Sequence, residues 1–538
     1  MPRPVSYDDV PYPRFAFEQT RPQRLAAIAR LAGLPAAAPE GCRTLEIGCA
    51  SGANLIPMAL ALPQSEFVGV DLSAGQIARA AEVACDLGLT NIRFEAADIL
   101  TWPEPDGRPP QRPFDYIIAH GVYSWTPPAV RSRLLELCGQ WLAPGGVAYV
   151  SYKAYPGGHA SDMMRQMSLF ANREVDDPRR WSASTREFLG FLQRGMPERD
   201  SAYRAVVLQQ TALFNDEDPD ALVHDELEAD CQPCYFHEFM RHAAEHGLQY
   251  LGDADYAASR GAGVSPEALD HLCPGDDLVE REQYLDFVYG RAFRATLLCR
   301  REAEVDRSVR PERVLGLMAL GDIRTVDDQD QPIALAATDL AGEAPWRFRV
   351  RHGVLAADDP VDKALLSRLA ANYPRGVAAR DLAAQAAERL AAAGVERPTT
   401  EVADDWAAGV AERLARWCAE GTIELIASQP EFTLAPGDRP VASPLARHEA
   451  ARGWRITSLL HHHVTLADPA MRQLLIWLDG GQSRAELAAR LAKPALSGRA
   501  SIEVEGRRLV DKRAIRRAFA KFVDDCLERF ARDGLLIA

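Results

Sequence analysis

Short apolar runs alternate with amphipathic segments over residues 1–150. The apolar runs predict buried strands at 44–47, 67–71, 91–95, 114–119 and 147–152, the last one after a turn at Pro144-Gly145-Gly146. Helices are expected between them at 54–62, 76–87 and 129–141, and Ser73 has the side chain of a helix N-cap. Strands that alternate with helices in this way indicate βαβ units and a parallel sheet.

Two more strands of the predicted sheet come much later in the chain. A helix at 237–246 ends at Gly247, and apolar runs follow at 248–251 and 293–299. This order, in which a helix and a strand are followed by an inserted segment and a further strand, predicts a seven-stranded sheet whose last strand is antiparallel. On this interpretation the first domain covers residues 1–302, with mostly helical insertions at about 158–232 and 257–290.

The remaining residues contain a weak internal repeat. Each copy has a helix, a glycine-containing turn, a second helix and a long helix that leads to a short apolar run. The copies begin at 365–373 and 471–478, and their final apolar runs are 421–426 and 534–537. The repeat predicts an α+β region with two winged-helix-like units, residues 361–438 and 439–538. A strand-rich connector is expected at 303–360.

Composition narrows the class of protein. The chain of 538 residues is 47% hydrophobic and 25% charged, as is usual for globular proteins, and its ten cysteines are scattered. It contains no apolar run of membrane-spanning length, and its first residues have no apolar signal-peptide core. We therefore expect a cytoplasmic protein without membrane insertion.

The charge is distributed unevenly. The formal net charge is −15, and residues 201–300 alone hold 7 Lys and Arg against 19 Asp and Glu. A net acidic chain disfavours nucleic acid as a partner, although residues 505–522 form a basic exception. The acidic stretch has two interpretations, an ordinary solvated surface or a surface that steers a basic substrate.

The residues that carry chemistry follow the first three predicted strands. The spacing Glu46-x-Gly48-x-x-x-Gly52 closes the first strand, where glycine lets the backbone approach a ligand closely. It does not match the dinucleotide pattern G-x-G-x-x-G. Asp71 ends the second strand, where a carboxylate can bond both hydroxyls of a ribose, and Asp98 follows the third strand, beside the place of an adenine amino group.

The segment Glu46-Ile47-Gly48-Cys49-Ala50-Ser51-Gly52, with Asp71 and Asp98, resembles the S-adenosylmethionine (SAM) site of class I methyltransferases. Further blocks resemble one subfamily: Tyr12-x-x-Phe15 with Thr20-Arg21-Pro22, residues 118–125, Tyr152-x-x-Tyr155-Pro156-Gly157, and residues 286–299. Its members carry a methyltransferase regulatory domain and include the bacterial lysine methyltransferases that modify outer-membrane proteins of rickettsiae. The sequence departs from that pattern at Lys153-Ala154, where an Asn is expected.

The resemblance implies a Rossmann-like class I methyltransferase fold with SAM as the cofactor. Its implied cofactor-binding residues are Tyr12, Glu46, Gly48, Cys49, Ala50, Ser51, Gly52, Asn54, Asp71, Leu72, Ser73, Ala97, Asp98, Ile99 and His120. Glu46, Gly48 and Gly52 are expected around the methionine portion, and Asp71 on the ribose. Asp98 is expected beside the adenine ring, which Leu72 and Ile99 sandwich.

The acceptor is expected at residues 120–125, which face the sulfonium methyl group in this fold. The candidates for its pocket are His120, Tyr123, Trp125, Tyr152 and Tyr155. Methyl transfer is an in-line displacement that needs an aligned, uncharged nucleophile, so a lysine acceptor must first lose a proton. Two alternatives stay open at these positions: Tyr123 is a catalytic group or pocket wall, and His120 is a cofactor contact or a base.

Two further clusters are assigned structural roles. Cys231-x-x-Cys234 near His237 lacks a second pair of ligands, so a turn is favoured over zinc and no metal is expected. His461-His462-His463 is interpreted as part of a strand, because adjacent strand residues alternate faces and do not converge on one ion.

The leading hypothesis is a SAM-dependent methyltransferase that acts on lysine side chains of a protein substrate, such as an outer-membrane protein, with its C-terminal units holding that substrate. The alternative within enzymes is O- or N-methylation of a small molecule. The alternative from another class is a SAM-binding regulatory protein whose winged helices bind nucleic acid or a partner.

Overall fold

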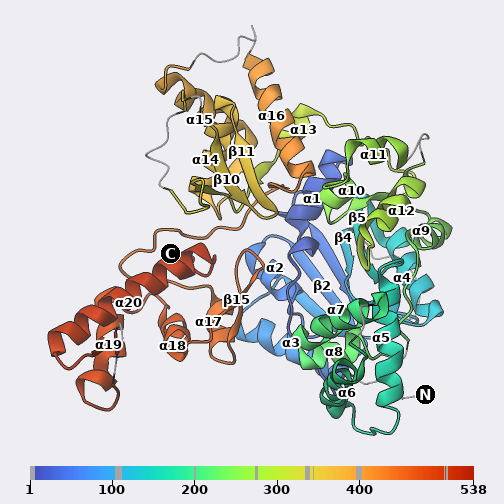
Figure 1. Cartoon of the computed structure of the whole chain (residues 1–538), viewed down its shortest axis with the longest axis horizontal. Coiled ribbons are helices and arrows are strands. Elements are labelled where there is room, and N and C mark those ends of the chain that lie inside the picture. The colour runs from blue at the N-terminus through green and yellow to red at the C-terminus, as the bar shows by residue number, and fades with distance from the viewer. Residues whose placement is uncertain are drawn as a thin grey trace.

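The computed structural model describes residues 7–102, 112–198, 201–228, 230–272, 277–333, 340–342, 344–395, 403–501, 503–504 and 507–538. Seven of the described strands form one mixed sheet in the order β3-β2-β1-β4-β5-β7-β6 (Figure 1). They are β1 (Arg43–Ile47), β2 (Glu66–Asp71), β3 (Ile92–Ala96), β4 (Phe114–Ala119), β5 (Leu142–Lys153), β6 (Leu248–Asp253) and β7 (Phe293–Arg300).

The directions of these strands match the prediction. Strands β1 to β5 run parallel, whereas β7 is antiparallel to both β5 and β6. The expected methyltransferase-type sheet is thereby confirmed. The carboxyl ends of β1, β2, β3 and β4 meet at one edge, where Asp71 pairs with Ala96 and Ala119 with Val150.

Strand β5 begins earlier than predicted. It starts at Leu142, and its register with β4 shifts between the pairs Phe114–Leu142 and Tyr116–Val147. The Pro144-Gly145-Gly146 segment is therefore an irregularity inside the strand rather than a turn before it. Extra residues on one strand of a pair leave the ladder without ending it.

Helices cover both faces of the sheet. They are α1 (Pro22–Leu31), α2 (Leu55–Ala61), α3 (Ala74–Asp86), α4 (Pro128–Trp141) and α9 (Phe236–Glu245), with short 3-10 turns η1 (Glu18–Thr20) and η2 (Tyr123–Trp125). One buried cluster joins α1 and α2 to Tyr116 and Ile118 of β4, and another joins α4 and α9 to Ile117 and Ala119. Successive side chains of β4 therefore point into the cores on opposite faces of the sheet, because side chains alternate along a strand.

Two helical segments interrupt this domain. The first holds α5 (Gly158–Ala171), η3 (Pro178–Arg180), α6 (Trp181–Gly195), α7 (Ala202–Asp216) and α8 (Pro219–Asp225). The second holds α10 (Tyr256–Ser259), α11 (Pro266–Leu272) and α12 (Leu278–Tyr289). Both lie within the ranges that the sequence assigns to insertions.

Residues after β7 form two small three-stranded sheets. The elements are α13 (Pro311–Val314), β8 (Met318–Leu320), β9 (Arg324–Val326), β10 (Trp346–Val350), β11 (Gly353–Ala357), α14 (Pro360–Asn372), β12 (Val377–Ala378), α15 (Ala379–Ala392), α16 (Ala403–Ala419) and β13 (Glu424–Ile426). The sheet orders are β11-β10-β9 and β12-β8-β13. Because β8 pairs with both β12 and β13, strand pairing crosses the predicted boundary at residue 360.

The last hundred residues form a separate cluster around long helices. Its elements are α17 (Pro444–Ala450), β14 (Arg455–Thr457), β15 (His463–Thr465), α18 (Pro469–Trp477), α19 (Arg484–Leu496), β16 (Glu503–Val504), β17 (Arg507–Arg508) and α20 (Lys512–Arg532). The apolar run at 534–537 makes only an isolated bridge, from Leu536 to Ala442, rather than a strand.

This C-terminal cluster packs on two of the helices that cover the seven-stranded sheet. Leu445 of α17 packs with Ile56 of α2 and Val83 of α3, and Figure 1 shows α17 and β15 beside those two helices. Arg452 adds an ion pair with Asp86, 3.3 Å apart. Among all described helices, none is both long enough and apolar enough to cross a membrane.

Candidate active site

The loop after β1 turns sharply beneath the carboxyl edge of the sheet. Gly48, Ala50 and Gly52 all have positive φ, at 75°, 45° and 69°. A Cβ atom on Gly48 would lie 2.6 Å from Val122, and one on Gly52 would lie 2.7 Å from Phe94. Glycine is therefore required at both positions for conformation and for space. The intervening Cys49 and Ser51 are buried.

Asp71 at the end of β2 is anchored by two backbone N–H groups. Its Oδ2 accepts from Ala50 N and its Oδ1 from Ser73 N, both at 2.8 Å. Burial nevertheless raises the pKa of this carboxyl above its usual range. The Ser73 hydroxyl caps α3 by accepting from Gln76 N, as predicted. The side chain of Asp71 is thus held rigidly, and each of its oxygens keeps a second lone pair for a ligand.

Beside Asp71 the surface changes from polar to apolar. Leu72 is 76% exposed, which is unusual for leucine, whereas Ile99 is only 8% exposed and packs in the core beside Ala97. Asp98 is exposed and accepts from Leu100 N at 2.9 Å. An exposed leucine and an exposed carboxylate at one sheet edge provide an apolar face and an acceptor for a flat heterocycle.

Glu46 is the most unusual group of the site. It is 3% exposed, its Oε1 accepts from Asn54 Nδ2 at 2.7 Å, and its Oε2 has no hydrogen-bond partner among the described residues. Burial raises the pKa of Glu46 to about 8. A buried carboxylate oxygen without a partner is costly unless a ligand supplies a donor, so this oxygen fits a cationic group such as an ammonium.

Asn54 connects Glu46 to distant parts of the chain. Its Oδ1 accepts from Phe17 N at 2.9 Å and from His461 Nε2 at 2.8 Å, and the Thr20 hydroxyl lies beside it. Because Oδ1 accepts these bonds, the amide nitrogen must face Glu46. Asn54 therefore acts here as an orienting group for the carboxyl.

The prediction that His461, His462 and His463 lie together in a strand is wrong. Only His463 belongs to β15, and His461 adopts a left-handed conformation with φ of 66°. The turn points all three side chains at the first domain: His461 at Asn54, His462 at Glu18 (2.5 Å), and His463 at the N–H of Ala16 (2.8 Å). The C-terminal cluster thereby touches the loop region of the candidate site.

Residues 7–20 cross the site and are fastened to α8. The Tyr7 ring stacks on His224 at 4.2 Å, and His224 bonds the carbonyl of Val10. Tyr12 donates its hydroxyl to Asp225 Oδ2 at 3.0 Å. Burial raises the pKa of Asp225 to about 7. Neither His224 nor Asp225 was singled out from the sequence, since no spacing links α8 to a tyrosine more than 200 residues earlier.

His120 after β4 lies in an aromatic stack. Its ring is 3.7 Å from that of Phe17, and its Nδ1 lies 3.0 Å from the Tyr149 hydroxyl. Burial lowers the pKa of His120 to about 3. The imidazole is neutral at physiological pH and is a very weak base, which favours a positioning or contact role over proton transfer.

Two tyrosines predicted for the acceptor pocket belong to the core. Tyr152 is fully buried, stacks on Phe239 at 4.2 Å and bonds the hydroxyl of Thr296. Tyr123 is 5% exposed, and its hydroxyl lies 2.8 Å from Nδ1 of His242. Tyr152 is therefore corrected to a core residue. Strand alternation directs it into the helix-covered face, and Tyr123 forms wall rather than an open reactive group.

Trp125 does reach a polar cluster. Its indole nitrogen donates to the carbonyl of Asp225 at 3.1 Å, and the ammonium of Lys153 lies 5.7 Å from its ring centre. Lys153 is paired with Glu226 at 2.7 Å. Trp125, Lys153 and Glu226, together with Tyr12 and Asp225, are called the acid–aromatic cluster below.

Tyr155 lies apart from that cluster. It stacks on His159 with ring centres 3.9 Å apart, and its N–H donates to the carbonyl of Cys234. Cys234 in turn donates its N–H to Lys153 O, so the Cys231–Cys234 segment pairs with the chain after β5. Within the described residues no group of three or more His, Cys, Asp or Glu side chains is arranged to hold a metal.

Part of the acidic stretch 201–300 is engaged in ion pairs inside the fold. Arg294 of β7 is fully buried and contacts Asp253, Glu282 and Asp286 at 3.4, 2.8 and 2.9 Å. Glu226 pairs with Lys153, as described above. These carboxylates are neutralised inside the fold, so less of the acidic charge than the sequence suggests is free to steer a substrate.

Three family models match separate parts of the chain. A methyltransferase domain matches residues 45–148, a predicted methyltransferase regulatory domain matches 218–300, and the C-terminal winged helix domain of PKMT matches 438–535. The uncharacterized protein RP789 of Rickettsia prowazekii is 28% identical over 535 residues, 99% of this chain and 93% of its own. RP028 of the same organism is 32% identical over 247 residues, 46% of this chain and 97% of its own.

A solved structure is similar over nearly the full length. PKMT2 from Rickettsia typhi, in complex with AdoHcy, superimposes with a TM-score of 0.85 at 25% identity. The alignment covers 98% of this chain and all of PKMT2. AdoHcy, S-adenosylhomocysteine, is what remains of SAM after its methyl group has left.

The strand order of the seven-stranded sheet, the glycine loop after β1 and the similarity to PKMT2 together define a class I SAM-dependent methyltransferase with SAM as its cofactor. More narrowly, the chain belongs to the family of methyltransferases that carry a methyltransferase regulatory domain and a PKMT-type C-terminal winged helix domain.

Proposed function

We propose that this methyltransferase transfers the methyl group of SAM to the side-chain nitrogen of a lysine in a protein substrate. The observation that carries the proposal is the acid–aromatic cluster, where Glu226 and Trp125 already hold the ammonium group of Lys153. Carboxylates and indole faces are the groups that bind an alkylammonium ion. The full-length likeness to PKMT2 supports the same acceptor class.

We assign the cofactor contacts to the residues of the glycine loop and the sheet edge. Asp71 takes the ribose hydroxyls, Leu72 and Ile99 flank the adenine, Asp98 accepts from its amino group, and Glu46 Oε2 accepts from the methionine ammonium. When bound, SAM supplies a methyl group attached to a positively charged sulfur. The residues of this chain have to align the acceptor, exclude water and receive one proton.

Asp225 is the proposed proton acceptor. Its pKa of about 7 makes it a stronger base than an ordinary carboxylate, and Tyr12 fixes its Oδ2. His120, with a pKa near 3, is too weak a base for this step. A lysine ammonium that gives one proton to Asp225 becomes the neutral nucleophile that in-line displacement requires.

We propose a division of labour between the two parts of the chain. Residues 1–302, with insertions at about 158–232 and 257–290, form the catalytic unit, and the region from 303 onward orients the substrate. The alternative function, methylation of a small molecule, is supported only by the methyltransferase core. That core does not by itself define the acceptor.

Radiolabelled methyl transfer from SAM into fractionated lysate tests the acceptor. We expect label in the protein fraction, released as methyl-lysine after acid hydrolysis, and about a hundredfold less label with Asp71→Ala. Label that enters only small molecules contradicts the lysine proposal. SAM binding without transfer to any fraction would instead support the regulatory alternative.

The pH dependence of SAM binding tests the role of Glu46. Its pKa of about 8 in the free protein means that most of the carboxyl is protonated at pH 6, whereas pairing with an ammonium requires the ionised form. Affinity should therefore rise from pH 6 to pH 8, by up to about tenfold per pH unit, as binding releases a proton. Calorimetric titrations of Glu46→Gln should give a flatter profile, and equal slopes for the two proteins would contradict the assignment.

A further inference from the structure

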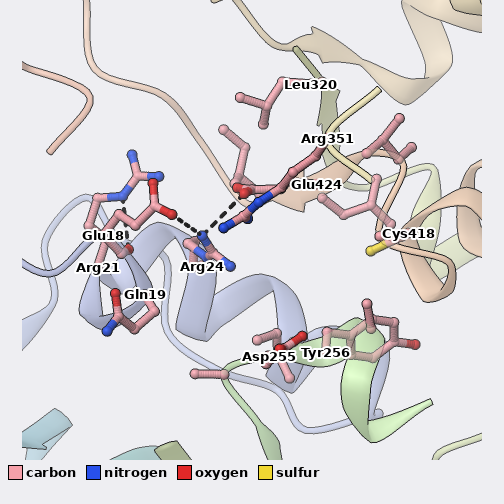
Figure 2. A pocket seen from close by; sticks show the side chains of 18 of the residues that line it. Glu18, Gln19, Arg21, Arg24, Asp255, Tyr256, Leu320, Arg351, Cys418 and Glu424 are labelled. Carbon is pink, nitrogen blue, oxygen red and sulfur yellow. Dashed lines mark hydrogen bonds and ion pairs between the residues drawn. The ribbon is translucent and has the colours of Figure 1, made fainter. Parts of the chain in front are cut away.

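A cavity of about 720 Å³ lies between the methyltransferase domain and the C-terminal region, and no residue of the glycine loop lines it. Its walls come from α1 and the edge of β6 and β7, from the β10–β11 turn, from the segment 418–429 and from the histidine turn of the winged helix domain. Figure 2 shows its charged lining, including Glu18, Arg21, Arg24, Arg351 and Glu424. The cavity is large enough for a small-molecule ligand.

Four of the five acidic residues that line this cavity form ion pairs, and the fifth, Asp255, accepts a hydrogen bond from Ala258 N. Glu18 contacts Arg24 at 3.4 Å and His462 at 2.5 Å, and Glu424 contacts Arg24 at 3.2 Å. Asp253 and Asp322 likewise pair with arginines, at 3.4 and 3.3 Å. These carboxylates have little remaining capacity to neutralise further cations.

The guanidinium of Arg21, in contrast, has no ion-pair partner among the residues that the structure describes. Arg21 is only 6% exposed, and its one side-chain hydrogen bond within the described residues runs from Nε to the carbonyl of Glu18 at 3.2 Å. Its pKa is lowered to about 10, first by burial and then by the charge of Arg24, and the charges of Glu424 and Glu18 offset this only in part. A buried cation repelled by its neighbour is costly, and an anion in the cavity would remove that cost.

Two further arginines face the same space with free donors. Arg351 has no hydrogen bond or ion pair to any described residue, and in Figure 2 its side chain extends toward Arg24 and Glu424. Arg291 pairs through Nη1 and Nε, but its buried Nη2 has no partner in the described part of the chain. The cavity thus combines mostly paired acids with guanidinium donors that have no partner in the described part of the chain.

We propose that this cavity is a binding site for a small polyanion with carboxylate or phosphate groups, held by Arg21 and Arg351. Forked N–H donors of arginine match the planar oxygen pairs of carboxylates and the oxygens of phosphate. Because the walls belong to three parts of the chain, the bound anion ties the methyltransferase domain to the C-terminal region.

Calorimetric and thermal-shift titrations of the full chain test the site, with citrate and pyrophosphate as probes. Saturating S-adenosylhomocysteine keeps the cofactor site filled, and sodium chloride keeps the ionic strength constant. We expect saturable binding of at least one probe and a rise in the melting temperature. Preference for citrate or for pyrophosphate distinguishes a carboxylate ligand from a phosphate ligand.

Three variants locate the binding. Arg21→Gln and Arg351→Gln should each weaken binding at least tenfold, whereas Arg241→Gln, at an exposed arginine of α9, should leave it unchanged. Without a probe, Arg21→Gln should melt no lower than the parent, because it removes an uncompensated buried charge. Absence of probe binding, or parental affinity in Arg351→Gln, overturns the proposal even if Arg21→Gln fails to fold.

Discussion

Replacing Asp71 with alanine is expected to weaken SAM binding by about a hundredfold or more. The carboxylate is held by the N–H groups of Ala50 and Ser73, so it meets the ribose hydroxyls without reorganisation. Each hydrogen bond to a charged group contributes about 1.5–3 kcal/mol, and about 1.4 kcal/mol corresponds to a factor of ten. Two lost bonds therefore account for the factor, and isothermal titration calorimetry measures it.

Asp98→Ala is the matched control for this experiment. Asp98 is assigned a single bond to the adenine amino group, and because this carboxylate is exposed the bond lies at the weak end of that range, so its removal should cost about tenfold. Circular dichroism of both variants should match the parent. Equal affinities for the parent and Asp71→Ala would contradict the assignment of the ribose site.

Replacing His461 with alanine is expected to weaken SAM binding by about tenfold, although His461 lies in the winged helix domain. Its Nε2 donates to Asn54, and Asn54 in turn orients Glu46. Loss of one hydrogen bond between neutral groups costs about 1 kcal/mol, and the freed Asn54 amide then turns away from Glu46 more easily. The effect should appear in the SAM dissociation constant and KM more than in kcat.

Two other variants isolate this hydrogen bond. His461→Gln should recover most of the affinity, because its side-chain amide can donate a hydrogen bond from nearly the position of Nε2. Glutamine and alanine carry the same backbone strain at this position, where φ is 66°, so the comparison isolates the hydrogen bond. His462→Ala removes the contact with Glu18 and leaves Asn54 untouched, so SAM affinity should stay at the parental level. Equal losses in all three variants would indicate general loosening of the domain contact instead.

The strand pattern and the acids at the strand ends were accessible from the sequence because they depend on local order. Glu46, Asp71 and Asp98 each follow a short apolar run, and parallel strands bring their carboxyl ends to one edge. Gly48 and Gly52 were equally visible, since each needs a positive φ that other residues adopt with strain.

The acceptor side was predicted less well. Trp125 lies in a polar cluster, but Tyr152 was wrongly assigned to the acceptor pocket. Whether a strand residue faces the core or a pocket depends on which helix covers that face, and Phe239 of α9 covers Tyr152. Asp225 carries no motif, and its raised pKa arises first from burial and then from the nearby charges of Glu226 and Glu217.

The sequence by itself determined the parallel sheet, its antiparallel closing strand, the glycine loop and the acids at the strand ends, because apolar periodicity and glycine dihedrals act over a few residues. Only the tertiary structure decided which distant groups meet: His461 with Asn54, Asp225 with Tyr12, and Arg21 with a cavity whose acids are mostly paired. The contact between His461 and Asn54 joins residues 407 positions apart in the sequence. Whether such distant side chains become buried or paired depends on how whole domains pack.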